Sequence, residues 1–64
     1  MIKIMGRQSR EIVLDYPKTV RTILEELKVS EERFVFLVNG TPVTKDVLVT
    51  PDQELVFLEI FSGG

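Results

Sequence analysis

Alternating apolar and polar residues open the chain and predict a β-hairpin. Residues 1–5 and 11–15 both carry apolar side chains at every second position, as strands with one buried face do. The polar residues 6–10 lie between them and begin with glycine, so they predict the hairpin loop. Pro17 ends the second strand because proline lacks the N–H that a ladder needs. The residues expected on the buried face are Ile2, Ile4, Ile12 and Leu14, and those expected on the opposite face are Met5 and Val13.

Apolar residues at helical spacing predict one amphipathic helix after this hairpin. They recur at i, i+3, i+4 and i+7 and so share one helical face. Thr19 precedes them and predicts the N-cap, because its hydroxyl can accept a hydrogen bond from an amide of the first turn. Residues 29–33 have no apolar period and predict an exit loop, with Ser30 placed to cap a short turn. The face predicted to be buried consists of Val20, Ile23, Leu24 and Leu27.

The second half of the chain predicts three more strands. Residues 34–38 are apolar at every position, which indicates a strand covered on both faces. Asn39 and Gly40 follow and predict a tight turn, because both residues tolerate a positive φ. The remaining segments are a short strand at 41–44 whose Pro42 suits a sheet edge, an irregular connection at 45–52 and the last strand at 54–61.

This order of elements predicts an α+β domain of the β-grasp, or ubiquitin-like, type. A single helix covers one face of a sheet, so we expect a mixed sheet of four to five strands with one packed helix. The first and last strands should lie in the middle of the sheet, and the last can run parallel to the first because a helical crossover precedes it. We expect residues 1–61 to form this domain and residues 62–64 to form a flexible Ser-Gly-Gly tail.

Alternation in the later strands predicts a surface for partners. The aromatic set, Phe34, Phe36 and Phe57 with Val38 and Leu55, is assigned to the face beneath the helix. A patch on the open face would then remain, and such patches often mark partner sites. The alternatives are a homodimer or lattice contact, or the opposite assignment of the two faces. The residues expected to bind partners are Leu37, Val56, Leu58 and Ile60, with Phe61 as an aromatic anchor.

Composition and charge narrow the function class. The 64 residues include no cysteine and no histidine, so thiolate metal sites, a cysteine nucleophile and a histidine base are absent; we expect no metal site and no enzyme. The net charge is −2 and the basic residues are scattered, which argues against direct binding of nucleic acid. Arg7, Arg10 and Lys45 could steer an acidic partner, although ordinary solvated charges account for them as well.

No apolar stretch approaches the roughly 20 residues of a membrane span and no signal peptide is evident, so we expect a cytoplasmic protein.

Gly63 and Gly64 follow the last strand directly. Without Cβ atoms, such a pair can thread a narrow channel and deliver a carboxylate to another protein's active site. Together with the order of elements and the Asn-Gly turn, it makes the chain resemble the sulfur-carrier proteins of the thiamine (ThiS) and molybdopterin (MoaD) pathways. Residues 38–43 resemble that family's strand–turn–strand segment, and residues 55–64 resemble its final strand and tail. Ser62-Gly63-Gly64 also resembles archaeal-type members that modify proteins.

The chain departs from that family's pattern at two places. Residues 51–54 read Pro-Asp-Gln-Glu where the family often has Asp-Gly-Asp, and both sequences favour a turn. Glu59 and Ile60 stand where molybdopterin-synthase subunits commonly have two prolines. This second departure counts against a specific MoaD assignment, and the short length favours the ThiS-like type.

The resemblance implies a carrier and not a catalyst. A ubiquitin-activating-type enzyme would use ATP to adenylate the Gly64 carboxylate, and the chain itself would bind no cofactor. A persulfide on a sulfur-donor protein would then displace AMP and leave a C-terminal thiocarboxylate. Thiazole synthase, the large subunit of molybdopterin synthase or a tRNA-thiolating enzyme would accept the sulfur. Gly63 would give the backbone access to these active sites.

Two other functions remain open at this point. A ubiquitin-like modifier would be joined through Gly64 to lysines of other proteins, after the same adenylation. A β-grasp interaction module would carry an inert tail, as small regulatory domains of larger enzymes do.

Overall fold

The structure, a computed structural model, describes residues 1–60. Residues 61–64, which include the end of the predicted last strand and the predicted tail, lie outside the described residues. The elements in the described part are β1 (Ile2–Met5), β2 (Arg10–Ile12), β3 (Lys18–Thr19), α1 (Val20–Leu27), the 3-10 helix η1 (Glu31–Arg33), β4 (Phe34–Val38), β5 (Thr41–Val43), β6 (Leu48–Val49) and β7 (Leu55–Glu59).

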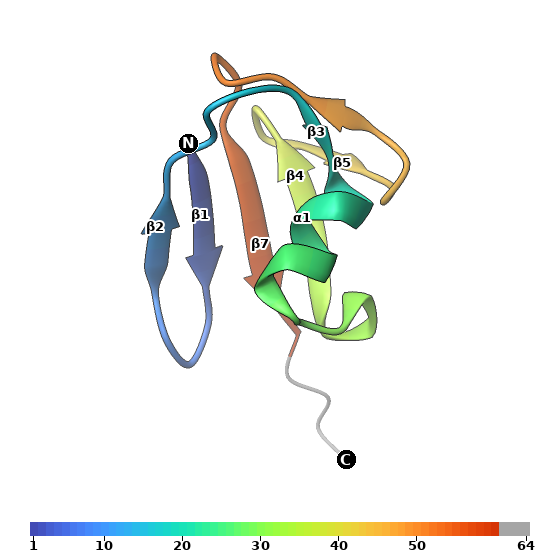
Figure 1. The fold of residues 1–64 in the computed structure, drawn as a ribbon. Helices are drawn as coiled ribbons and strands as arrows, with labels where there is room; N and C mark the ends of the chain where they lie inside the picture. The colour runs from blue at the N-terminus through green and yellow to red at the C-terminus, as the bar shows by residue number, and fades with distance from the viewer. Residues whose placement is uncertain (61–64) are drawn as a thin grey trace.

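Five of the strands form a mixed sheet in the order β2-β1-β7-β4-β5 (Figure 1). β1 pairs antiparallel with β2 and parallel with β7, so β7 lies at the centre of the sheet. β4 pairs antiparallel with both β7 and β5. α1 lies across one face of this sheet (Figure 1). The arrangement confirms the predicted β-grasp fold, with the first and last strands side by side.

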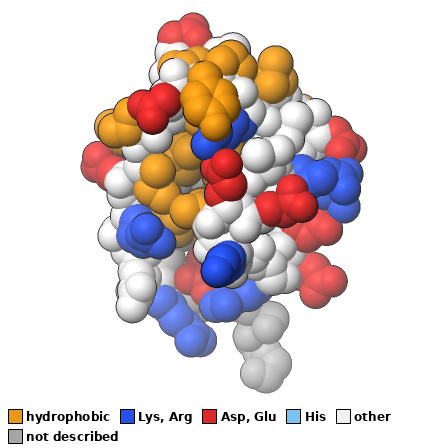
Figure 2. All heavy atoms as spheres, viewed as in Figure 1, with side chains coloured by type: hydrophobic (Ala, Val, Ile, Leu, Met, Phe, Trp, Pro, Cys, Tyr) orange, Lys and Arg blue, Asp and Glu red, His pale blue; other side chains and the backbone are white. Residues whose placement is uncertain are grey.

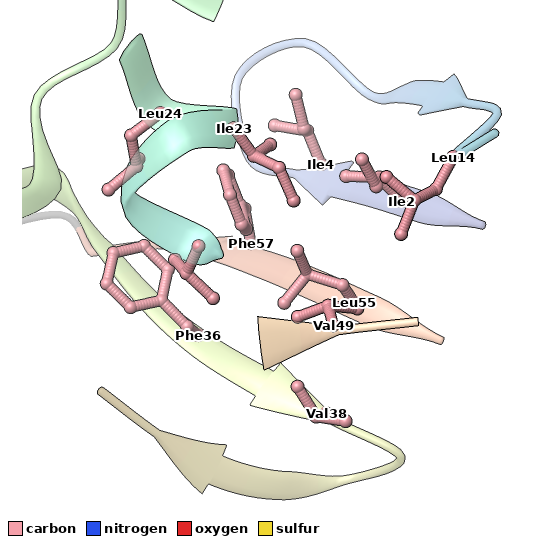
Figure 3. Close-up of a cluster of buried hydrophobic side chains, with 11 residues drawn as sticks. Ile2, Ile4, Leu14, Ile23, Leu24, Phe36, Val38, Val49, Leu55 and Phe57 are labelled. Carbon is pink, nitrogen blue, oxygen red and sulfur yellow. The ribbon is translucent and has the colours of Figure 1, made fainter. Parts of the chain in front are cut away.

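The hydrophobic core lies between this face and α1 (Figure 3). Phe57 of β7 is fully buried at its centre, and the ring of Phe36 meets the Phe57 ring nearly edge-on, with 5.1 Å between centroids. The Phe34 ring, two residues from Phe36 along β4, also packs against Phe57, with 5.8 Å between centroids. The aromatic set therefore faces the helix, as the alternation predicted. The buried hydrophobic residues are Ile2, Ile4, Leu14, Val20, Ile23, Leu24, Phe36, Val38, Val49, Leu55 and Phe57.

Caps at both ends define the helix. The Thr19 hydroxyl accepts a hydrogen bond from the Thr22 amide at 3.2 Å, which confirms the predicted N-cap. At the other end Lys28 adopts a left-handed conformation with φ 58°, and the Val29 amide donates to the Leu24 carbonyl at 3.2 Å. This bond closes the last turn in the manner of a Schellman motif. Ser30 stands at the N-cap of η1, but its side chain makes no capping hydrogen bond. No helix in residues 1–60 is long and apolar enough to cross a bilayer.

The segment predicted as an irregular connection at 45–52 contains a strand, so that prediction was wrong. Leu48 and Val49 form β6, which pairs antiparallel with β3 in a second, two-stranded sheet. The Val20 amide donates to the Val47 carbonyl at 3.0 Å, and the Arg21 amide donates to the Lys45 carbonyl at 2.9 Å. These carbonyls satisfy amides of the first helical turn that have no partner inside the helix. The need to pair those amides explains why the segment is ordered there.

Four predicted strands have boundaries that differ from the structure. β1 begins at Ile2 instead of residue 1, β5 ends at Val43 instead of residue 44, and Ile60, predicted inside the last strand, follows the end of β7. The returning strand of the first hairpin was predicted at 11–15, but β2 covers Arg10–Ile12, because only three residues pair with β1. Leu14 still turns into the core, and Val13 is exposed as predicted. The last strand was predicted to begin at 54, whereas β7 covers Leu55–Glu59 in the described part.

The turn between β4 and β5 has the predicted conformation. Asn39 and Gly40 have φ values of 49° and 84°, and Val38 pairs with Thr41 on either side of them. Positive φ at both central residues of a two-residue hairpin loop is the feature of a type I′ turn. The resulting β5 lies at the edge of the sheet, where the missing N–H of Pro42 is tolerated.

Candidate functional site

The sheet face opposite α1 carries most of the apolar patch predicted from the sequence. Leu37 of β4 lies directly opposite Val56 of β7, and both are half-buried. Leu58, two residues along β7, is 43% exposed. Their strand neighbours Phe36 and Phe57 are buried beneath the helix, so alternation directs these three side chains to the open face.

Two neighbouring strands add residues that were not predicted as partner-binding. Met5 of β1 and Val35 of β4 are the cross-strand partners of Leu58, one on each side, and both are exposed. Sequence alternation placed them on this face, but only the register shows that they flank Leu58. We call Met5, Val35, Leu37, Val56 and Leu58 the open-face patch.

Ile60, the next predicted residue, follows the end of β7. Its side chain is 50% exposed, and its amide donates a hydrogen bond to the Arg33 carbonyl at 2.8 Å. The last described residue is therefore held by its backbone against η1. Phe61, Gly63 and Gly64 lie outside the described residues, so their predicted roles stay predictions.

Glu59, immediately before Ile60, binds two other parts of the chain. One carboxylate oxygen accepts from the Arg7 amide at 3.0 Å, in the loop between β1 and β2. The other accepts from the Arg33 guanidinium at 2.8 Å, at the end of η1. Only 9% of the Glu59 side chain is exposed. We call Gly6, Arg7, Arg33, Glu59 and Ile60 the tail-root cluster, because it holds the chain just before residue 61.

The pKa of Glu59 follows from these contacts. The hydrogen bond from the Arg7 amide lowers the pKa of the Glu59 carboxyl below its usual value, and the Arg33 guanidinium lowers it further, against the opposing effect of burial. Glu59 is therefore a carboxylate near neutral pH. Hydrogen bonds from the loop between β1 and β2 and from η1 stabilise its negative charge.

Gly6 allows this arrangement because it has no side chain. A Cβ atom at residue 6 would meet both the Cβ and a carboxylate oxygen of Glu59, closer than nonbonded atoms approach each other. The hairpin loop can thus lie directly against the end of β7. In Figure 1 this loop, the end of β7 and η1 lie at the same end of the molecule.

The comparison with family models decides the family. Residues 1–58 match the model of small archaeal modifier protein 2. The chain belongs to this family. Its members are ubiquitin-fold proteins of the modifier and sulfur-carrier type, to which ThiS and MoaD are related, and such proteins act with an activating enzyme of the E1 kind. A separate comparison with curated proteins finds no significant match.

In this member of the small archaeal modifier family, the sequence alone did not reveal the tail-root cluster. Glu59 and Ile60 were noted only as a departure from a double proline. Glu59 contacts residues 26 and 52 positions away along the chain, and no local pattern signals contacts at such separations. Within residues 1–60, no group of acidic side chains is placed to hold a metal ion. The described part of the site thus consists of an apolar open face and a backbone hydrogen bond that fixes Ile60, the last described residue.

Proposed function

We propose that this chain is a sulfur carrier whose C-terminal Gly64 is converted to a thiocarboxylate. The observation that carries the proposal is the position of Gly63-Gly64 in the sequence, four and five residues after the central strand of a ubiquitin-fold modifier. A ubiquitin-activating-type enzyme supplies the energy from ATP. The proposed setting is the cytoplasm.

The proposed reaction begins at the carboxylate of Gly64. One of its oxygens attacks the α-phosphorus of ATP, the bond to pyrophosphate breaks, and an acyl-adenylate forms. The terminal sulfur of a persulfide protein then attacks the carbonyl carbon, and AMP leaves. A second thiol cleaves the resulting acyl disulfide, so that the thiocarboxylate remains on Gly64 and a disulfide forms on the donor. Because the sulfur resides on a carbonyl carbon, the carrier needs no cysteine of its own.

The proposed acceptors are thiazole synthase, the large subunit of molybdopterin synthase, or a tRNA-thiolating enzyme. In each case the folded body serves for docking. The open-face patch supplies apolar contact together with Ile60, Phe61 is the proposed aromatic anchor, and Gly63 gives the narrow backbone that enters the active site. The tail-root cluster supports this division between a docking body and a reactive Gly64, because its hydrogen bonds fix the backbone at Ile60, four residues before Gly64.

A second candidate function is conjugation, and the description of the matched family as modifiers favours it. Gly64 would then form an isopeptide bond with the ε-amine of a lysine on another protein, with AMP as the leaving group. Both candidate functions need the same adenylation, so one protein can carry out both. They differ in the group that attacks the activated carbonyl of Gly64: a persulfide sulfur in carriage and a lysine amine in conjugation.

Mass spectrometry of the protein isolated from its own cells distinguishes the two. Carriage predicts a fraction of intact chains whose mass shows one oxygen replaced by sulfur. Conjugation predicts other proteins whose lysines carry residues 60–64 after digestion at glutamate, because cleavage follows Glu59. The control is a chain lacking Gly63 and Gly64, which should give neither product. If the truncated chain sustained the cell's sulfur-dependent pathways, the tail would be inert and the proposal wrong.

A further inference from the structure

A pocket of about 240 Å³ opens beside the tail-root cluster. Its apolar lining comes from Ile4, Val29 and Phe34, and its basic lining comes from Arg7, Arg10 and Arg33. Arg10 is the cross-strand partner of Ile4, a core residue, so its side chain lies on the helix side of the sheet. We call this the arginine pocket. The sequence singled out Arg7 and Arg10, and the fold adds Arg33 and the apolar lining.

The charges around the arginine pocket are unbalanced. Its lining holds three guanidinium groups and one carboxylate, that of Glu59, which Arg33 already binds. Arg10 is exposed, and none of the ion pairs within residues 1–60 includes it. Figure 2 shows Lys and Arg side chains gathered at the lower end of the molecule, where β7 ends in Figure 1. The lining of the pocket therefore carries more basic than acidic groups, on a chain whose net charge is −2.

A second pocket of similar size provides a contrast. It measures about 230 Å³ and is lined by Arg21, Lys28 and Lys45 together with two glutamates. Arg21 binds Asp46 at 2.7 Å, in place of the Glu25 that follows it by one helical turn, and Lys45 binds Glu31 at 3.0 Å. Two of its three cations thus bind acidic partners of their own, whereas Arg10 of the arginine pocket belongs to no ion pair within residues 1–60.

The position of the arginine pocket makes it face any enzyme that takes up Gly64. Gly64 is the fourth residue after Ile60, and a fully extended chain covers at most about 14 Å over that length. An enzyme that holds Gly64 in its active site must therefore bring its surface against the end of the molecule from which the chain leaves. Glu59, which lines the pocket, lies at that end.

We propose that the arginine pocket receives an acidic segment of the activating enzyme. A carboxylate of that segment binds the guanidinium groups of Arg10 and Arg33, and an apolar side chain beside it covers Ile4 and Phe34. Guanidinium groups suit this role because they bind carboxylates through two parallel hydrogen bonds. The inference rests on the proposed function, since it needs the enzyme that adenylates Gly64.

An acidic protein segment fits the arginine pocket better than a nucleic acid does. Binding to a phosphate backbone draws on a basic surface that extends over several phosphates. Here the basic groups surround a small apolar recess, and the carboxylate of Glu59 stands in its wall. A single carboxylate with an apolar neighbour matches both features.

Charge reversal at Arg10 tests the inference. The KM for the carrier is measured in ATP–pyrophosphate exchange by the ubiquitin-activating-type enzyme of the same cells. We expect Arg10→Glu to raise this KM roughly tenfold with kcat retained, and Arg10→Gln to give a smaller rise. Added salt should raise the KM of the unaltered chain more steeply than that of Arg10→Glu. Thermal unfolding of each variant checks that the fold is intact.

Arg21→Glu is the matched control, because it makes the same change of charge on α1, outside the lining of the arginine pocket. It should leave KM within about twofold of the original value. An equal rise for Arg21→Glu would show that net charge alone acts, and an unchanged KM for Arg10→Glu would also overturn the inference. Loss of binding to total tRNA by Arg10→Glu, at unchanged KM, would assign the pocket to nucleic acid instead. If the unaltered chain forms no acyl-adenylate, the proposed function itself fails, which is a separate result.

Discussion

Glu59 holds together the three segments that meet at the end of β7. Its carboxylate joins β7 to the first hairpin loop and to η1, two segments that are remote in sequence. The neighbouring amide of Ile60 repeats the contact to Arg33 through the backbone. A charged, largely enclosed carboxylate therefore determines where the chain leaves the fold.

The stability of the fold should depend on the ionisation of Glu59. Its pKa is lower in the folded state than in the unfolded chain, so its contribution is complete above the unfolded pKa of about 4.3 and is lost as the pH falls through the folded pKa. We expect Glu59→Gln to unfold at a lower temperature than the unaltered chain at pH 7, and the difference between the two melting temperatures to shrink as the pH falls below about 4.3. Melting curves between pH 3 and 7 measure this. A constant difference across that range would contradict the assigned role.

Gly6 and Gly40 should fail to accept side chains for different reasons. At Gly40 there is open space around a Cβ, but φ is 84°, so Gly40→Ala should cost about 1 kcal/mol and Gly40→Asn less, because asparagine tolerates positive φ. At Gly6 a Cβ of any residue meets Glu59, so Gly6→Ala and Gly6→Asn should both cost about 1–3 kcal/mol. Urea unfolding of the four variants tests the distinction. Recovery of stability by asparagine at residue 6 would show that contact with Glu59 is not the cause.

At the scale of elements, the backbone amides at the start of α1 find hydrogen-bond acceptors in two different parts of the chain. The Thr19 hydroxyl accepts from the Thr22 amide, while carbonyls of the segment before β6 accept from the Val20 and Arg21 amides. The first turn of the helix is therefore fastened to carbonyls that lie 27 and 24 residues further along the chain than the amides they bind. This closure positions the apolar face of α1 over the sheet.

The two predicted helix caps should differ in their contribution to stability. Thr19→Ala removes a capping hydrogen bond and should lower the free energy of unfolding by about 1 kcal/mol. Ser30 occupies the matching position of η1 without such a bond, so Ser30→Ala should cost only a few tenths of a kcal/mol at most. Urea unfolding of both variants measures the difference. Equal losses would mean that the Thr19 hydroxyl is not the group that matters.

The elements that the sequence predicted correctly have strong local patterns. The helix has four apolar residues that recur at helical spacing on one face, and the Asn39-Gly40 turn has residues that tolerate a positive φ. β6 could not be predicted in the same way, because it has two residues and its pairing with β3 depends on the first turn of α1. The open-face patch was predicted in part, since alternation gives the face but only the register shows that Met5 and Val35 flank Leu58. The tail-root cluster depends on contacts between three distant segments and left no local pattern.

At the scale of the whole molecule, the proposed function separates docking from chemistry. The described residues form a five-stranded sheet with an apolar open face, a helix-covered core and one basic end. In the proposed function, the folded body serves for docking and Gly64 alone reacts. A membership in the small archaeal modifier protein 2 family fits this division, since such modifiers act through an activating enzyme.

The central claim is that the carboxylate of Gly64 is the group on which the activating enzyme acts. The most direct test incubates the purified chain with ATP labelled at the α-phosphate and the ubiquitin-activating-type enzyme of its own cells, then looks for label bound to the chain. We predict an acid-stable acyl-adenylate on the unaltered chain, and none on a chain that lacks Gly63 and Gly64 but still folds. Failure of the unaltered chain to acquire label, or equal labelling of the truncated chain, would contradict the account.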